Sequence, residues 1–334
     1  MDGTLILATS FRRCFNGCRI MSRFSIVIPV TRGNRQPNQI HRFEDTLASV
    51  LRSRPRQAQI IVVHDGSYED PHGLGSEIDW VVETSSNLAS QFDLGVSASR
   101  GDLIVLIRPG VELDEGWDSS FEEAFEDPQV GSLTPLIVPS SRPGRIAAAG
   151  VVTNAAGTRR LLGSQQRLSD RSLQSLKPLG PSSHLAVYRR AILTAIGRWG
   201  CLTDDVYLDV EIALSLRTLG FSNVLCRDAI ATVESEDWIL AESNRPHGCT
   251  AERSLYRYTR HGRSSTLART LMDVAKSPLQ PWLLSHGFQR LAAKRERSAD
   301  QLFRRHLAVV KNTESWRETT VEENSSRTTR RRAA

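Results

Sequence analysis

The chain has 334 residues, of which 40% are hydrophobic and 24% charged, so it is long enough for one large domain or two small ones. This apolar content excludes a chain that is disordered throughout. A formal charge of +6 and a pI near 9.3 have two interpretations: a solvated surface with a floppy basic tail, or attraction to an anionic partner such as nucleotide phosphates, an anionic membrane face or nucleic acid.

Four short apolar runs in the first third of the chain predict the strands of a buried sheet, at residues 24–30, 59–63, 80–82 and 103–107. A helix with Phe43 and Leu47 on one face follows the first run. A helix over 88–100, ended by Gly101, precedes the fourth. Apolar strands that alternate with helices indicate a parallel sheet covered on both faces. Ligands of such sheets bind at the carboxyl ends of the strands.

The second half predicts strands at 130–138, 146–152 and 184–190, and two short edge strands at 224–226 and 230–233. Residues 164–181 are polar and rich in turn formers, which predicts a mobile loop. A helix with Ile212, Leu216 and Leu219 on one face ends at Gly220.

The flanks differ from this central region. We expect residues 1–21 to be a leader that is disordered or not translated, because Met21 stands just before the first strand. We expect one α/β domain over 22–262, a basic helical extension over 263–311 and a disordered tail over 312–334. No run of residues is long and apolar enough to span a membrane. Five cysteines without metal-binding spacing predict free thiols and a cytoplasmic protein.

Five segments, in order over residues 24–262, resemble family 2 glycosyltransferases. They are IVIPV, IIVVHDGSYED, NLASQFDLGVSASRGDLIVLI, SSHLAVYRRAILTAIGRWG and YLDVEIALSLRTLGF. The resemblance implies a GT-A fold, with a Rossmann-like, mixed but mainly parallel sheet flanked by helices. It also implies an inverting transfer of a sugar from a nucleoside diphosphate to the hydroxyl of a glycan or lipid-linked acceptor.

The resemblance implies that Asp65 binds the nucleotide, because it matches the family's second aspartate, whereas His64 replaces the first. A carboxylate at the end of a buried strand can accept hydrogen bonds from a base or a ribose. The alternative is a turn in which Asp65 bonds its own backbone. Thr31, after the first strand, is a second candidate for the nucleotide pocket.

The resemblance makes Asp209 the candidate catalytic base and gives Glu211 a supporting role. The alternative for Asp209 is an ordinary helix N-cap. Residues two apart do not share a helix face, so the two carboxylates should point in different directions. Asp204 and Asp205 are rivals for the role of base.

The chain departs from the family at the fourth strand, where Arg108-Pro109-Gly110 replaces the Asp-x-Asp metal motif. Mg²⁺ or Mn²⁺ would therefore lack its usual oxygen ligands, and Glu112 or Asp114 is the nearest replacement. Two interpretations are open. Arg108 neutralises the diphosphate without metal, or catalysis is lost and the domain only binds a nucleotide, a glycan or a partner protein.

Two further alternatives concern the partner. A nucleotidyltransferase would need a Gly-rich phosphate loop, of which Arg32-Gly33 is only a trace, and no nucleic-acid-binding pattern is present. The basic cluster of Lys294, Arg295, Arg297, Arg304 and Arg305 predicts peripheral contact with the anionic inner face of a membrane.

Overall fold

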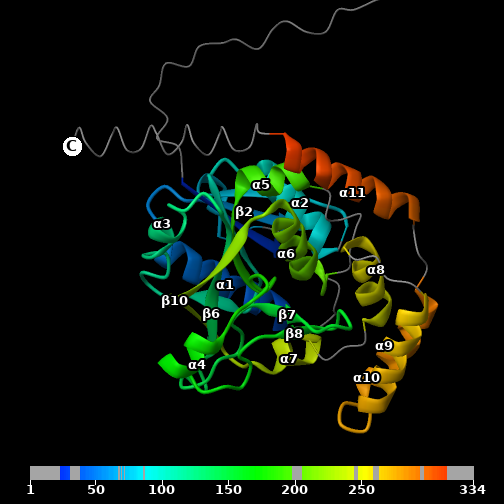
Figure 1. Ribbon diagram of the computed structural model, residues 1–334. Coiled ribbons are helices and arrows are strands. Elements are labelled where there is room, and N and C mark those ends of the chain that lie inside the picture. Colours follow the sequence, from blue (N-terminus) through cyan, green and yellow to red (C-terminus); the bar gives the residue numbers. More distant parts are fainter. Residues whose placement is uncertain are drawn as a thin grey trace, which may run out of the picture.

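The structure is a computed structural model, shown in Figure 1, that describes residues 23–30, 38–66, 68, 70, 72–85, 87–197, 205–243, 247–258, 263–293 and 297–313. The expected leader, Thr31, Asp204 and almost all of the expected tail lie outside these residues.

An eight-stranded mixed sheet forms the centre of the molecule, in the order β3-β2-β1-β4-β9-β6-β10-β5. Its strands are β1 (Phe24–Val30), β2 (Gln59–His64), β3 (Ile78–Val82), β4 (Leu103–Ile107), β5 (Val111–Leu113), β6 (Val130–Pro139), β9 (Leu185–Arg189) and β10 (Ser222–Val233). Strand β9 runs antiparallel to its neighbours β4 and β6, and β5 runs antiparallel to β10; the other pairs are parallel. A small hairpin of β7 (Val151–Thr153) and β8 (Arg159–Leu161) stands apart from the sheet.

Helices cover both faces of this sheet (Figure 1). They are α1 (Asn38–Ser53), α2 (Leu88–Ala98), α3 (Phe121–Ala124), α4 (Asp170–Ser175), α5 (Arg190–Ile196), α6 (Leu208–Leu219), α7 (Asp237–Ser243), α8 (Gly248–Tyr258), α9 (Arg263–Lys276), α10 (Trp282–Ala292) and α11 (Arg297–Asn312). Alternate strand residues point to opposite faces. Ile26 and Ile28 therefore pack with Phe43 of α1, whereas Val27 packs with Phe92 of α2 and with residues of α5, α6 and α11. The mixed, mainly parallel sheet between helices confirms the predicted fold class.

The ends of two helices show how local sequence sets the boundaries. Gly220 caps α6 in the left-handed region, with φ of 93°, as predicted. The end of α2 was predicted at Gly101, but this helix stops at Ala98. Gly101 instead lies against the backbone of β1, where a Cβ atom would come within 2.6 Å of the Phe24 carbonyl carbon.

The prediction of two short edge strands near residue 230 was wrong. Residues 222–233 form one strand, β10, which lies inside the sheet between β6 and β5. Its register shifts between Leu225 and Ile230, and the polar pair Arg227-Asp228 in this shift makes one strand look like two in the sequence.

Helices α9 and α10 lie to one side of the sheet (Figure 1), whereas α11 contributes Phe303, Leu307 and Val310 to the core cluster on one face of the sheet. Helix α10 packs on α8 and α9, and α11 packs on α5, α6 and α8. Ion pairs join α8 to α9 and α10 across residue 262, where we expected the extension to begin. None of the helices in the described part of the chain is long and apolar enough to cross a membrane.

Candidate active site

The carboxyl edge of the sheet gathers polar residues from distant parts of the chain. Asp65 follows β2 and Arg108 follows β4. Because β9 runs antiparallel to β4, the residue just before β9, His184, lies at the same edge of the sheet. The Arg108 backbone N–H donates to the His184 carbonyl at 2.9 Å. The predicted location for a ligand therefore holds a cation, a carboxylate and a histidine.

An ion pair fixes the Arg108 side chain. Its Nη1 atom lies 2.9 Å and 2.8 Å from the two carboxylate oxygens of Glu242, which α7 supplies. The same carboxylate lies 3.0 Å from Nε2 of His184, which is almost fully buried. Burial alone would raise the pKa of Glu242, but Arg108 and His184 hold that pKa well below its ordinary value. Glu242 is therefore ionised at neutral pH.

His184 is neutral in this arrangement. Burial lowers the pKa of its imidazole below the ordinary value, and this effect outweighs the hydrogen bond to Glu242. A neutral ring can donate its Nε2–H to Glu242. The Nδ1 atom has no hydrogen-bond partner within the described part of the chain.

The turn after β4 is held from two sides. Trp238 of α7 packs edge-on against His184, with ring centroids 5.2 Å apart, and Arg42 of α1 lies 5.4 Å from the Trp238 ring centroid. Gly110 has φ of 95°, and a Cβ atom there would lie 3.3 Å from Trp238. Only glycine adopts this backbone in that space without strain, so α7 closes tightly over Arg108.

Asp209 lies at the start of α6 and has no exposed surface. Its oxygens accept hydrogen bonds from Nε of Arg159 at 2.9 Å and from Nη2 of the same residue at 2.7 Å. The backbone N–H of Ser183 donates to it at 3.0 Å. Burial alone would lower the pKa of Arg159, but Asp209 raises it, so Arg159 stays charged.

Glu211 is also fully buried, but it faces a different arginine. Its carboxylate lies 2.7 Å from Arg257 of α8. The two carboxylates thus point in different directions, as their spacing predicts. Asp205 accepts a hydrogen bond from the Leu88 backbone at the start of α2, 2.6 Å away.

An aromatic group lies beside Asp65. The rings of Tyr68 and Trp80 stack with centroids 5.4 Å apart, and His64 meets Trp80 edge-on at 5.9 Å. The hydroxyl of Tyr68, Nε1 of Trp80 and Nδ1 of His64 are buried polar atoms without a partner in the described residues. Buried polar atoms of this kind normally have partners.

Glu112 does not join the residues around Arg108. It lies on the edge strand β5, where burial and nearby Asp45 raise its pKa. No group of three His, Cys, Asp or Glu side chains able to hold a metal ion occurs in the described ranges. The residues at the end of β4 do not fit a divalent metal, because Arg108 stands where carboxylates would be needed.

A cavity of about 420 Å³ lies beside the Asp209–Arg159 pair. Arg159 and Arg160 of β8, Leu240 of α7 and Gln280 before α10 contribute to its lining. The sequence did not point to Glu242, His184 or Arg159 as site residues, because the fold brings each of them to the site from a distant segment.

The fold has counterparts among solved structures, whereas no family model and no curated protein matches the sequence. The chain has the GT-A fold of glycosyltransferases. The mannosyltransferase PcManGT from Pyrobaculum calidifontis, solved with GDP-Man and Mn²⁺, aligns over 91% of this chain and 84% of its own, with 14% identity and a TM-score of 0.50.

Two further structures are similar in part. GalNAc-T7, solved with UDP, GalNAc and Mn²⁺, shares 14% identity over 64% of this chain, with a TM-score of 0.48. The match spans 43% of GalNAc-T7, less than half of its length. Residues 1–349 of TarS from S. aureus share 12% identity over 84% of this chain and 78% of TarS, with a TM-score of 0.48. At these identities the likeness concerns the fold alone.

Proposed function

We propose that the chain is an inverting family 2 glycosyltransferase that moves a sugar from a nucleoside diphosphate to an acceptor hydroxyl. The observation that carries this proposal is the Arg108 guanidinium at the carboxyl end of β4, beside the ligand edge of a GT-A fold. A guanidinium pairs well with diphosphate oxygens and keeps its charge at every physiological pH. Arg108 would then stabilise the departing diphosphate without a metal.

Glu242 gives this site a built-in competitor for the diphosphate. In the absence of donor its carboxylate neutralises Arg108. Glu242 engages Nη1 of Arg108, so a diphosphate would either bind Nε and Nη2 against the opposing charge of Glu242 or replace Glu242 at Nη1. Replacement at Nη1 would couple donor binding to the position of α7, which also carries Trp238.

Asp209 is the proposed base that takes the proton of the acceptor hydroxyl, and Glu211 supports it by holding α6 against α8. Arg159 donates to both oxygens of Asp209, so it has to move away before this carboxylate can accept the proton. The cavity beside Arg159 gives an acceptor a route to this pair. Inversion then follows in a single displacement at the anomeric carbon.

Asp65 and Thr31 are proposed to bind the nucleotide. Asp65 supplies a carboxylate at the end of β2, next to the stacked rings of Tyr68 and Trp80. The GDP-Man bound to the Pyrobaculum mannosyltransferase makes GDP the first nucleotide to test. Glu112 is the proposed ligand only if Mg²⁺ or Mn²⁺ is required.

The acceptor is proposed to be a glycan or a lipid-linked glycan of polysaccharide biosynthesis. The enzyme would meet it in the cytoplasm, at the inner face of a membrane. The basic residues near the C-terminus motivate this location.

Calorimetric titration with GDP and UDP, first with Mn²⁺ and then with a chelator, tests the proposal. We expect one diphosphate to bind equally well under both conditions, and the matching sugar donor to be hydrolysed or transferred. Binding that needs Mn²⁺ would overturn the role of Arg108 and direct attention to Glu112. Absence of binding under both conditions would contradict the proposed transferase.

One observation favours a second function, a non-catalytic binding module. Asp209 and Glu211 are both enclosed in ion pairs that also link elements of the fold, Asp209 of α6 to β8 and Glu211 of α6 to α8. Such a module would bind a nucleotide or a glycan without turning it over. Tight diphosphate binding with no donor consumption in any acceptor mixture would favour this reading.

A further inference from the structure

The helical hairpin of α9 and α10 buries mainly polar side chains and exposes most of its large apolar ones; Leu283 is the buried apolar exception among the described residues. The buried face of α9 repeats at intervals of three and four residues, with Thr266, Arg269, Thr270 and Asp273. On α10 the buried face includes His286 and Arg290. This is the reverse of the usual pattern of a surface helix, which buries its apolar stripe.

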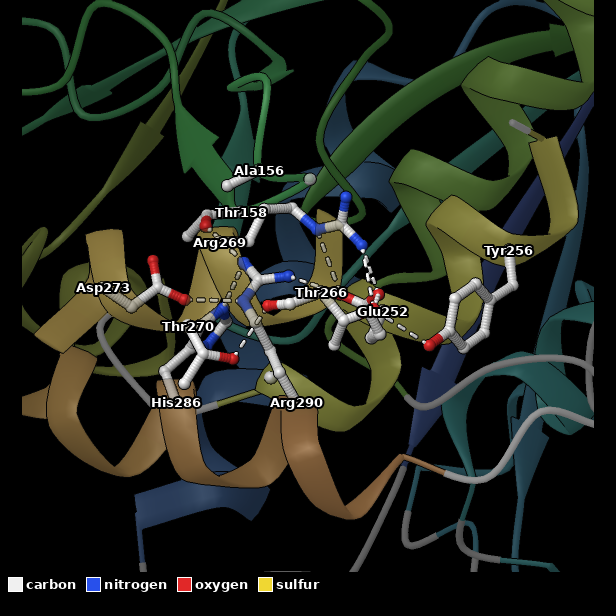
Figure 2. Close-up of polar contacts among 12 residues, drawn as sticks. Ala156, Thr158, Glu252, Tyr256, Thr266, Arg269, Thr270, Asp273, His286 and Arg290 are labelled. Atoms are coloured by element: carbon white, nitrogen blue, oxygen red, sulfur yellow. Dashed lines mark hydrogen bonds and ion pairs between the residues drawn. The ribbon is translucent and has the colours of Figure 1, made fainter. Parts of the chain in front are cut away.

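Glu252 of α8, together with Asp273 of α9 itself, pairs with the arginines of this buried polar face (Figure 2). Arg290 lies 2.5 Å from Asp273, 3.3 Å from Glu252 of α8 and 2.9 Å from the hydroxyl of Thr158. Arg269 pairs with the same Glu252, and the Thr266 hydroxyl donates to it at 2.6 Å. Buried charges persist only when they are paired in this way, so the network fixes which face of the hairpin points outward.

The outward face is apolar. Of the eleven large hydrophobic side chains that are exposed in the described ranges, seven lie between residues 267 and 291. They are Leu267, Leu271, Met272, Leu279, Leu284, Phe288 and Leu291. Leu279, in the turn between the two helices, is 88% exposed, and Phe288 is 60% exposed. A concentration of this kind marks a surface that is covered in use.

The charge around this face has one sign. Between residues 253 and 295 the sequence contains nine lysines and arginines and one acidic residue, Asp273. Three of the nine, Arg257, Arg269 and Arg290, are buried and paired with carboxylates, which leaves six others in this stretch of the sequence. Asp273 is buried and paired with Arg290, so it presents no negative charge to a partner. Lys276, at the end of α9, is exposed.

We propose that the outer face of α9 and α10 docks on an anionic lipid surface. Amphipathic helices with an apolar face and basic flanks lie in the plane of the membrane interface, and anionic headgroups attract the basic residues. A second copy of this chain fits less well, because two such faces would bring like charges together. The sequence directed attention to residues 294–305, but the apolar contact surface lies on the hairpin before them.

The hairpin also borders the cavity of the candidate site. Gln280, next to the exposed Leu279, lines the cavity beside Arg159. If the proposed transfer is correct, docking would hold this cavity close to the lipid surface, where a lipid-linked acceptor is found.

Vesicle flotation of the full chain tests the docking without any donor or acceptor. We expect the protein to float with vesicles that contain phosphatidylglycerol and to stay behind with vesicles of phosphatidylcholine alone. Leu271→Glu and Phe288→Glu each place a charge on the apolar face, and each should lower vesicle partitioning about tenfold. Both side chains are exposed, so the substitutions leave the buried network intact.

Ile40→Glu is the matched control, because Ile40 is an exposed apolar residue on a helix of the main domain. It should float like the unaltered protein. Equal partitioning of all variants, or no preference for anionic vesicles, would overturn the proposal. So would a dimer in sedimentation that Phe288→Glu dissociates, because the face would then bind a second copy. Since no substrate is present, failure here leaves the proposed transfer untouched.

Discussion

Arg108 and Glu242 lie 134 positions apart in the chain and form an ion pair at the carboxyl edge of the sheet, with Nη1 of Arg108 within 2.9 Å of both carboxylate oxygens. The pair links β4 to α7. It also sets a single cation against a single carboxylate at the point where a donor diphosphate would bind.

Substitutions of these two residues should change nucleotide affinity in opposite directions. Arg108→Ala removes the cation and should weaken diphosphate binding by about tenfold, the value of one charged hydrogen bond. Glu242→Gln removes the competing charge and should strengthen binding by a similar factor. Calorimetry measures both.

The matched control is Arg54→Ala, which breaks an ion pair between Arg54, just after α1, and Glu77, just before β3. Nucleotide affinity should stay the same in this variant. Equal weakening by Arg108→Ala and Glu242→Gln would show that the pair only supports the fold.

Asp209→Asn should abolish most of the transfer while nucleotide binding is kept. The amide preserves the shape of the side chain but cannot take a proton, so turnover should fall by about 10² to 10⁴. Single-turnover assays with a donor and an acceptor mixture measure this step.

Glu211→Gln controls for the loss of a buried charge, because it lies on the same helix and is buried to the same degree. It should lower stability but keep the turnover of the folded fraction. A similar loss of turnover in both variants would argue against Asp209 as the base.

The hairpin network should make stability depend on pH. Burial, the charge of Arg290 and the proximity of His247 lower the pKa of His286 from 6.5 to about 3. Both ring nitrogens face donor groups, the His247 backbone N–H and the Arg290 guanidinium. A second proton on the ring would place a buried cation beside the Arg290 guanidinium.

The unfolded chain takes up this proton below its ordinary pKa, whereas the folded chain does not. The free energy of unfolding should thus fall as the pH drops from 6.5 toward 3, by up to about 1.4 kcal/mol per pH unit. Urea unfolding at pH 7, 6 and 5 measures the slope. The slope of His286→Gln should be smaller by this amount, and identical slopes would refute the assignment.

Arg290→Met should destabilise the protein strongly. It leaves Asp273 buried without its counter-ion and leaves Glu252 with Arg269 alone, a change that costs about 3 to 5 kcal/mol. Lys276→Met on the exposed side of α9 should cost less than about 0.5 kcal/mol. Arg290→Met combined with Asp273→Leu should recover part of the loss, because the unpaired carboxylate is gone.

The sequence predicts the parallel half of the sheet well, because β1, β2 and β4 are continuous apolar runs buried on both faces. The shortest strand of the sheet was not predicted. Val111–Leu113 is three residues long, and its position at the sheet edge depends on pairing with Val233, 122 positions later. Nothing local in the sequence specifies such a pairing.

Some residues of the candidate site can be predicted from the sequence and others cannot. Arg108 can be predicted, because an apolar strand pattern ends directly before it. Glu242 cannot, since its role depends on how α7 folds back over β4. His184 was predicted only as the first residue of a strand. Its place at the carboxyl edge follows from the antiparallel direction of β9, which the sequence does not reveal.

Glu252 makes the folding of α9 and α10 depend on α8. The polar face of α9 and α10 holds two arginines but one aspartate, so the pair of helices cannot neutralise itself. The missing negative charge comes from α8, which is synthesised earlier. A peptide of residues 263–293 would therefore carry surplus positive charge on the face it has to bury, and a chain cut at residue 262 would leave Glu252 without either arginine. The C-terminal helices should accordingly melt together with α8, in one cooperative transition, rather than fray away on their own.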